Sequence, residues 1–295
     1  MLYTYCISQH LTEEYIMSRT SKVWFITGAS RGFGALIAKD ALNRGDKVIA
    51  TARNPQTVID ALGNQANLLA LKLDVTDEQA AIEAAKQSIE RFSRIDILVN
   101  NAGYGLLGAV EESGDQEVKD LFNTNVFGLL NVIRAVVPYM RNQASGHILN
   151  ISSIGGYASY PGWGAYCATK FAVEALTESL AYELKPLGVM ATTVEPGFFR
   201  TDFLDSTSLV STQKSFTEYA ETVGAMRSFA ASANHAQPGD PAKLSQAILK
   251  LVDSKNPPLR LPLGSDTVHK IKEKNEFVEQ ELNAWKEVAI STDFT

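Results

Sequence analysis

Short apolar runs alternate with segments of helical periodicity along most of this chain. The apolar runs predict strands buried on both faces: Val23–Ile26, Lys47–Ala52, Leu68–Leu73, Ile95–Val99, His147–Ile151 and Val189–Val194. The periodic segments predict helices: Ala35–Arg44, Asp77–Phe92, 116–141, the run containing Tyr166, Pro241–Val252 and the tail from Asp266. This alternation predicts one α/β domain, with a doubly wound parallel sheet of about seven strands and helices on both faces.

The last third of the chain departs from this alternation. Residues 198–240 are rich in Ser, Thr and Phe and predict a substrate loop, since long insertions in compact domains are usually functional. Leu259–Leu263 predicts a seventh strand, which Pro262 restricts to an edge or an end of the sheet. The predicted organisation is a tail over 1–20, a main domain over 21–264 that includes the substrate loop, and a C-terminal helical extension over 265–295.

Residues 1–16 precede the first predicted strand. They lack the basic start and apolar core of a secretory signal, and Glu13 and Glu14 interrupt the segment. Met17 begins a stretch that looks like an ordinary protein start. We therefore expect a tail that folding and activity do not need; the alternative is an arm that docks on a partner.

Composition narrows the classes of function. The chain has 295 residues, 45% of them hydrophobic, which suits one large α/β domain or two small ones. Its net charge of -6 argues against a nucleic-acid-binding protein, and no apolar run approaches the ~20 residues of a membrane span. Cys6 and Cys167 give neither a disulfide framework nor a zinc ligand set, and no metal motif appears. A cytoplasmic location is expected.

A glycine-rich turn joins the first predicted strand to the first predicted helix. It reads Thr27-Gly28-Ala29-Ser30-Arg31-Gly32-Phe33-Gly34, with the spacing G-x-x-x-G-x-G. Strand, turn and helix in this order suit a pyrophosphate, because glycines allow close approach of the backbone and the helix N-terminus offers amide donors. The alternative is a plain glycine turn.

The end of the second strand bears on the choice of nucleotide. An NAD-preferring site usually has an acidic residue there, which binds the ribose 2′-hydroxyl. This chain has Ala52 and Arg53 instead, and Arg31 lies within the glycine turn. Two arginines near the ribose favour a 2′-phosphate and hence NADP(H), although either one alone is explained equally by a solvated surface charge.

Tyr166 and Lys170 lie four residues apart in a helical run, so they share one helix face. An ammonium beside a phenol stabilises the phenolate and lowers the phenol pKa from about 10, which suits a proton donor. By itself the pair is better explained as a surface lysine beside a half-buried tyrosine. Ser153 follows a strand end, where α/β sheets bind ligands, and Asn125 is locally unfavourable inside a helix unless it faces solvent or bonds to a partner.

Taken in order, these motifs resemble the short-chain dehydrogenase/reductase family. Its TGxxxGxG, NNAG and YxxxK segments match 27–34, 100–103 and 166–170, with Ser153 thirteen residues before Tyr166, and the likeness runs from about Lys22 to Asp202. It implies a Rossmann-type domain that binds NADP(H). The cofactor-binding residues it implies are Gly28, Ser30, Arg31, Gly32, Phe33, Gly34, Arg53, Asp74, Val75, Asn101, Ala102, Gly103, Tyr166, Lys170, Pro196, Gly197, Phe199 and Thr201.

The resemblance also implies a reaction. A hydride passes between the nicotinamide and a carbonyl carbon, Tyr166 donates or accepts the proton, and Ser153 orients the oxygen. Lys170 bonds the nicotinamide ribose, and Asn125 holds a water that links Lys170 to solvent. The resemblance further implies a homo-oligomer, a dimer or tetramer, that pairs through the helices of Asn125 and Tyr166.

The substrate is less well defined by the sequence. Apolar residues of the substrate loop predict an apolar pocket: Phe198, Phe199, Phe203, Leu204, Leu209, Phe216 and Tyr219. Such a pocket suits a hydrophobic ketone, aldehyde or secondary alcohol. The main alternative is a non-enzymatic, NADPH-binding redox-sensing protein on the same fold, which an intact set of Asn125, Ser153, Tyr166 and Lys170 disfavours. A lyase or isomerase on this scaffold is a third interpretation.

Overall fold

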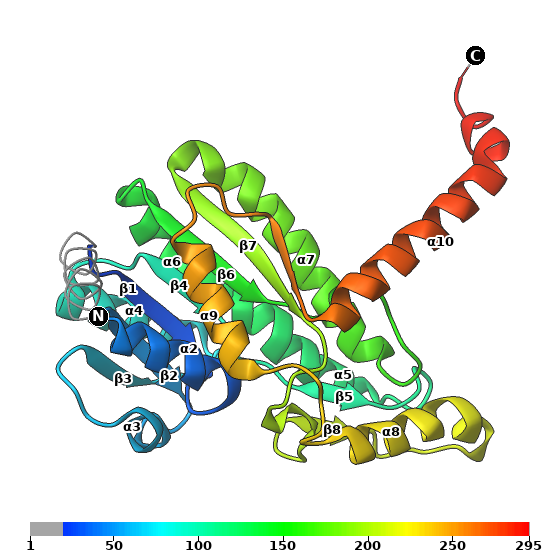
Figure 1. Ribbon diagram of the computed structural model, residues 1–295, viewed down its shortest axis with the longest axis horizontal. Coiled ribbons are helices and arrows are strands. Elements are labelled where there is room, and N and C mark those ends of the chain that lie inside the picture. The colour runs from blue at the N-terminus through cyan, green and yellow to red at the C-terminus, as the bar shows by residue number, and fades with distance from the viewer. Residues whose placement is uncertain (1–19, 295) are drawn as a thin grey trace, which may run out of the picture.

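Seven parallel strands form the central sheet of the computed structural model, which describes residues 20–294 (Figure 1). They are β1 (Val23–Thr27), β2 (Lys47–Ala52), β3 (Leu68–Lys72), β4 (Ile97–Asn100), β6 (Gly146–Ile151), β7 (Val189–Pro196) and β9 (Arg260–Leu263). Their order is β3-β2-β1-β4-β6-β7-β9. The chain winds outward from β1 in one direction and from β4 in the other, so the predicted doubly wound sheet is confirmed.

Helices cover both faces of this sheet. The helices are α2 (Gly32–Asn43), α3 (Gln56–Leu62), α4 (Glu78–Phe92), α5 (Asp115–Phe122), α6 (Leu129–Asn142), α7 (Gly164–Leu184), α8 (Ala225–Ala233), α9 (Pro241–Val252) and α10 (Ser265–Ile290). Val23 and Phe25 of β1 pack with residues of α4, α6 and α7. Trp24 and Ile26 point the other way and pack with residues of α2 and α9. The strand is therefore buried on both faces, as its continuous apolar run predicted.

Several short elements were not predicted from the sequence. They are α3, α8 within the substrate loop, and a second parallel sheet of β5 (Gly105–Leu107) and β8 (Leu209–Ser211). Three-residue strands are too short to show a hydrophobic period. By contrast, Pro262 lies in the edge strand β9, as predicted, and the carboxylate of Asp77 accepts a hydrogen bond from the Ala80 amide at the start of α4.

The helix predicted over 116–141 is present as one helical stretch, Asp115–Asn142, but it is not regular throughout. A π-helical turn, η1 (Asn123–Gly128), separates α5 from α6. The amide of Asn125 is bonded to the backbone of Tyr104 and to Thr169, so tertiary contacts hold this turn open. Asp115–Asn142 is also the one stretch within residues 20–294 long and apolar enough to span a membrane, but 56% of its most apolar window is buried, as in a core helix.

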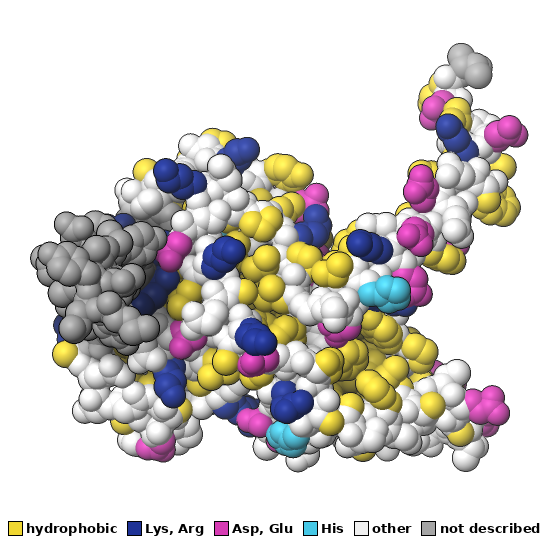
Figure 2. Space-filling model, in the orientation of Figure 1, with side chains coloured by type: hydrophobic (Ala, Val, Ile, Leu, Met, Phe, Trp, Pro, Cys, Tyr) yellow, Lys and Arg dark blue, Asp and Glu magenta, His cyan; other side chains and the backbone are white. Residues whose placement is uncertain are grey.

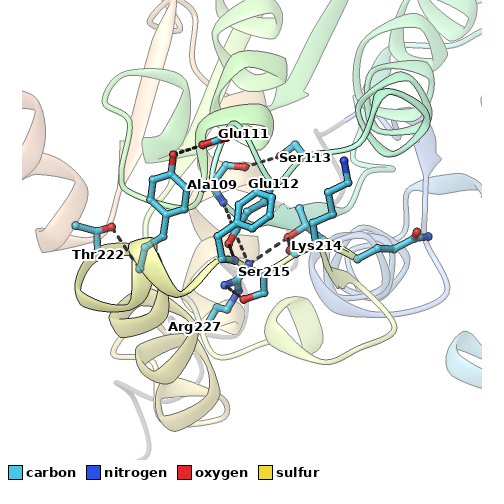
Figure 3. A network of polar contacts seen from close by, with 12 residues as sticks. Ala109, Glu111, Glu112, Ser113, Lys214, Ser215, Thr222 and Arg227 are labelled. Atoms are coloured by element: carbon cyan, nitrogen blue, oxygen red, sulfur yellow. Dashed lines mark hydrogen bonds and ion pairs between the residues drawn. The ribbon is translucent and has the colours of Figure 1, made fainter.

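The substrate loop is fastened to the segment before α5. Glu112, which is fully buried, accepts hydrogen bonds from the amides of Ala109 and Phe216 and from the Arg227 guanidinium, each at 2.7 Å (Figure 3). The same guanidinium donates to Ser215, and Tyr219 donates to Glu111. We call this network the loop anchor. It joins residues 215–227 of the substrate loop to residues 109–112, just before α5.

Helix α10 extends away from the rest of the chain (Figure 1). The predicted amphipathic helix is present, but Phe277, Val278, Leu282 and Trp285 on it are exposed. Near its base, Lys270 lies over the ring of Tyr160 and Asn275 accepts a hydrogen bond from Tyr157. On the face shown in Figure 2, hydrophobic side chains gather between the base of α10 and α8. Residues 1–16, the part of the tail predicted to be dispensable, lie outside the described residues.

Candidate active site

The glycine turn lies where the sheet changes winding direction, between the carboxyl ends of β1 and β4. Gly28 has φ +63°, and a Cβ there would lie 3.1 Å from the Cα of Ala102. A Cβ on Gly34 would lie 2.4 Å from the Gly28 carbonyl oxygen. The amide of Asn101 donates to the carbonyls of Thr27 and Gly28, at 3.0 Å each. The glycines thus permit a close backbone packing that brings 27–34 and 100–103 together.

The start of α2 is open in a way that suits an anion. Gly32 has φ +56°, and a Cβ there would meet no heavy atom within 4 Å. Arg31 occupies the N-cap position, and its side chain accepts no hydrogen bond from the first backbone amides of the helix. Those amides are therefore available to a ligand. Free amides at a helix N-terminus beside a glycine turn fit a pyrophosphate.

A cavity of about 1090 Å³ runs along this edge of the sheet. Every cofactor-binding residue implied by the family resemblance lines it except Gly34, and so do Ser153, Tyr166 and Lys170. Gly34 packs behind the turn and Asn125 lies behind Lys170, so neither reaches the cavity wall. The residues fit a dinucleotide, since one continuous space joins the glycine turn, Asp74 and the Tyr166 hydroxyl.

The two arginines predicted to select the nucleotide, Arg31 and Arg53, differ in their contacts. Arg53 is exposed and lines the cavity beside the buried Ala52. Arg31 also lines it, but its Nη2 donates to the Thr207 carbonyl and to the Ser208 hydroxyl, both at 2.8 Å. Arg31 therefore holds the substrate loop over the glycine turn. Its role toward a 2′-phosphate stays a prediction, as does that of Arg53.

Tyr166 and Ser153 approach each other in the wall of the cavity. A Cβ on Gly155 would lie 3.4 Å from Ser153 Oγ and 3.5 Å from Tyr166 Cε1. Ser153 Oγ accepts a hydrogen bond from the Gly155 amide at 3.0 Å, which fixes its direction. Helix α7 supplies Tyr166 from its first turn, and β6 delivers Ser153 just beyond its end. A phenol and a hydroxyl so placed can both reach one substrate oxygen.

Lys170 and Asn125 complete this group. Lys170 is 7% exposed, and its Nζ donates to the Ile151 carbonyl at 2.9 Å and lies 5.7 Å from the centroid of the Tyr166 ring. A Cβ on Gly103 would lie 3.0 Å from Asn125 Oδ1 and 3.8 Å from Lys170 Nζ. Asn125 is buried and bonded to Tyr104 and Thr169. Of the two placements that the sequence allowed, it therefore bonds to partners and does not face solvent.

The expected effect of Lys170 on Tyr166 does not appear in the protein alone. Burial raises the pKa of Tyr166 above its ordinary value, and a hydrogen bond with Ser153 only partly opposes this. Burial also lowers the pKa of Lys170 to about 8, against the charge of Glu174, which raises it. Both groups are therefore in their proton-carrying forms at neutral pH, as donation of a proton to a developing alkoxide requires.

Aromatic side chains form the wall beside Tyr166. The ring centroid of Trp163 is 5.5 Å from that of Tyr166, and Phe203 of the substrate loop is 5.6 Å from Tyr166. Of the loop residues predicted to form the pocket, Phe198, Phe199, Phe203 and Leu204 line the cavity. Leu209, Phe216 and Tyr219 do not: Leu209 packs in the apolar cluster of Leu106 and Trp163, and the other two belong to the loop anchor.

Trp163 and Gln237 are among the cavity residues that the sequence did not single out. Trp163 is only three residues from Tyr166 and could have been inferred from that spacing. Gln237 is buried, lines the cavity, and has neither side-chain amide atom in a hydrogen bond among residues 20–294. It lies in irregular chain after α8, where the sequence offers no signal.

Known proteins are similar to this chain in sequence and in fold. The short chain dehydrogenase family model matches residues 22–210. A 3-ketodihydrosphingosine reductase of Bacteroides thetaiotaomicron is 39% identical over 244 residues, covering 82% of this chain and 88% of that protein. The structure of a short-chain dehydrogenase from Streptomyces avermitilis has a TM-score of 0.86 and 42% identity, covering 93% of this chain and 100% of the other.

A more distant structure, ElxO with NADP bound, has a TM-score of 0.69 and 26% identity, covering 85% of this chain and 100% of the other. The matched residues 22–210 span the glycine turn, Ser153, Tyr166 and Lys170, which the fold brings to one cavity. The chain therefore belongs to the short-chain dehydrogenase family and is an oxidoreductase of that family.

Proposed function

We propose that this protein is an NADP(H)-dependent carbonyl reductase or alcohol dehydrogenase. The observation that carries the proposal is the meeting of Ser153, Tyr166 and Lys170 in the same cavity as the open N-terminus of α2. A phenol suited to proton donation and a backbone suited to phosphate, both lining one space, support this proposal. ElxO, the relative with NADP bound, supports the choice of cofactor class.

The residues of the chain perform the proton chemistry. Bound NADPH would supply a hydride to the carbonyl carbon. Tyr166 donates its phenolic proton to the carbonyl oxygen, and the Ser153 hydroxyl donates a hydrogen bond that orients the same oxygen. Lys170 faces the Tyr166 ring as an ammonium and would hold the nicotinamide ribose, while Asn125 positions the backbone of Tyr104 behind it. The reverse oxidation uses the same groups.

The substrate we propose is a hydrophobic ketone, aldehyde or secondary alcohol. Trp163, Phe203 and Leu204 give the cavity an apolar wall next to the proton donor, so a bulky apolar carbonyl compound would bury most of its surface there. The relative named as a 3-ketodihydrosphingosine reductase, 39% identical, supports a ketone.

A panel of carbonyl compounds tests the proposal. We expect NADPH oxidation, followed at the nicotinamide absorbance, with apolar ketones or aldehydes and little with small polar ones. NADPH binding without turnover on any member would favour the redox-sensing alternative. Conversion of a substrate without net oxidation of NADPH would favour a lyase or isomerase.

The preference for NADP(H) has its own test in Arg53. Hydrogen bonds to charged groups contribute about 1.5–3 kcal/mol, so Arg53→Ala should weaken NADPH binding roughly 10- to 150-fold. NADH should be little affected, because it offers no 2′-phosphate. Lys39→Ala is a matched control, since it removes an exposed cation of α2 outside the cavity. If the unsubstituted enzyme prefers NADH, or if both cofactors weaken equally in Arg53→Ala, the proposed role of Arg53 is wrong.

We also propose a cytoplasmic homo-oligomer. Phe127 of η1 and Phe171 and Tyr182 of α7 are large, exposed and apolar, on the two helices that the family resemblance pairs between subunits. Light scattering at micromolar concentration should give the mass of a dimer or tetramer. A monomeric mass would contradict this part of the proposal.

A further inference from the structure

Two buried carboxyl groups lie beneath the active site and belong to none of the roles described above. Glu174 is on α7, one turn after Lys170, and is 6% exposed. Glu195 is at the end of β7 and is fully buried. Arg260 of the edge strand β9 faces both: its Nε is 3.3 Å from Glu174 Oε2 and 3.7 Å from Glu195 Oε1.

The charges around this carboxyl pair do not balance. Arg260 is the cation that contacts both members, and its Nη2 is already bonded at 2.6 Å to a third carboxylate, that of Glu178. The hydroxyls of Ser152 and Thr193 favour the charged form of Glu174, but within residues 20–294 no hydrogen bond of ordinary geometry reaches any of the four pair oxygens. Two ionised, buried carboxylates with one shared cation are costly.

One proton resolves both problems at once. A proton on either carboxyl removes one negative charge and also provides the donor that the pair lacks, as two carboxylates held close together commonly share a proton. The pKa values of Glu174 and Glu195 are both raised, as a retained proton requires. Burial raises both, and the negative charge of Glu174 raises that of Glu195 further.

The pair lies next to the catalytic groups. A Cβ on Gly156 would lie 2.5 Å from Ser152 Oγ, 3.1 Å from Glu174 Cγ and 3.1 Å from the Lys170 carbonyl oxygen. The turn that follows Ser153 therefore rests directly on Glu174 and on the Lys170 backbone. Positions i and i+4 share a helix face, so Glu174 is also the carboxyl nearest Lys170 along α7.

We infer that Glu174 and Glu195 hold one proton between them at neutral pH, and that the negative charge left on Glu174 keeps the buried Lys170 protonated. Glu174 is thus a positioning residue, since it acts through Lys170 and touches neither the cavity nor the reacting atoms. The groups that face it are Lys170 and Glu178 of α7, Glu195 of β7 and Arg260 of β9. The catalytic part of this inference rests on the proposed function, whereas the shared proton does not.

The charge of Glu174 sets the pH at which Lys170 loses its proton. Removing that charge should make the buried ammonium less favourable, so the pKa of Lys170 should fall below its value of about 8. At an effective dielectric of about 20, one charge at the i,i+4 separation is expected to shift the pKa by about one unit or more. Activity that depends on the Lys170 ammonium should therefore decline at lower pH in Glu174→Gln.

Three glutamine substitutions along this cluster provide the test. In the pH profile of kcat/KM for carbonyl reduction, Glu174→Gln should move the alkaline limb down by about one pH unit. Glu195→Gln should leave the limb in place, since its amide substitutes for the protonated acid. Glu178→Gln is the matched control: it also removes a carboxylate from Arg260, on the same helix, but one turn further from Lys170. Equal profiles for Glu174→Gln and Glu178→Gln would overturn the effect on Lys170.

A second measurement tests the shared proton without using activity. Unfolding by denaturant at several pH values should show that the unsubstituted protein loses stability relative to Glu195→Gln as pH rises from 4.5 to about 8. A constant difference across that range would show that both carboxyls ionise freely and would overturn the inference. An enzyme that reduces no carbonyl compound would refute the proposed function, and this titration would still decide whether the pair shares a proton.

Discussion

The loop anchor and the carboxyl pair both bury glutamate, and they do so in opposite ways. Glu112 accepts two backbone amides and a guanidinium, and these bonds outweigh the effect of burial and lower its pKa. Glu174 and Glu195 share one guanidinium with Glu178 and have no backbone donors among residues 20–294, and burial raises their pKa values. The number of donors aimed at a carboxyl, rather than its burial, decides whether it carries a charge.

The difference separates two uses of a buried acid. At the loop anchor the charge is fully satisfied, which fixes the substrate loop against the segment before α5. In the carboxyl pair the charge is left partly unsatisfied, so it responds to pH and to neighbouring residues. One substitution, Glu to Gln, should therefore have opposite effects in the two places.

Glu112→Gln should give the larger effect. Either orientation of the new amide places its NH2 against a backbone N–H or the guanidinium, so several charge-assisted bonds are lost. We expect a loss of about 3 kcal/mol in the free energy of unfolding, together with faster proteolysis within 198–240. Denaturant unfolding and limited proteolysis measure the two effects. Stability equal to that of the unsubstituted protein would show that Glu112 is not the anchor.

Glu195→Gln should act in the opposite sense. A carboxyl whose folded-state pKa lies above its unfolded value destabilises the fold increasingly as pH rises between the two, here from 4.5 to about 8. Removing it should stabilise the protein by about 1–2 kcal/mol at pH 8 and by almost nothing below pH 4.5. Denaturant midpoints at these two pH values measure the gain. A variant that is less stable than the unsubstituted protein at pH 8 would show that Glu195, like Glu112, is a hydrogen-bonded carboxylate that stabilises the fold in its charged form.

Tyr219→Phe should give the smallest effect. Its hydroxyl donates to Glu111 at the solvent-exposed rim of the loop anchor. Exposed polar contacts contribute little, so we expect no measurable change in melting temperature and no change in KM. A clear drop in melting temperature would show that the anchor extends to its rim.

The sequence predicted the parts of this protein that depend on local pattern. Lys47–Ala52 has the bounds of its strand, because the apolar Val48, Ile49 and Ala50 at its centre are buried whichever face of the sheet they point to. The π-helical turn at Asn125 could not be predicted, since its cause is a bond to Tyr104 and Thr169 made across the fold. The candidate site residues formed an ordered set in the chain, and the sheet then brought all of them except Gly34 and Asn125 to the wall of one cavity.

The carboxyl pair shows most clearly where sequence reasoning stops. Glu174 is an ordinary charge on a helix, and Glu195 an ordinary residue at a strand end. Their meeting depends on α7 packing against β7, and β9, which pairs with β7, brings Arg260 to both. Such packing is a property of the whole fold, so neither residue carries a local signal of its partner.

The central claim is that Tyr166 is the proton donor of an NADPH-dependent reductase, and one variant tests it most directly. Tyr166→Phe keeps the ring that packs against Trp163 and Phe203 and removes only the hydroxyl. We predict that this variant binds NADPH with unchanged affinity and that its kcat for carbonyl reduction falls roughly 100- to 10,000-fold. Turnover near that of the unsubstituted enzyme, with NADPH bound normally, would contradict the account.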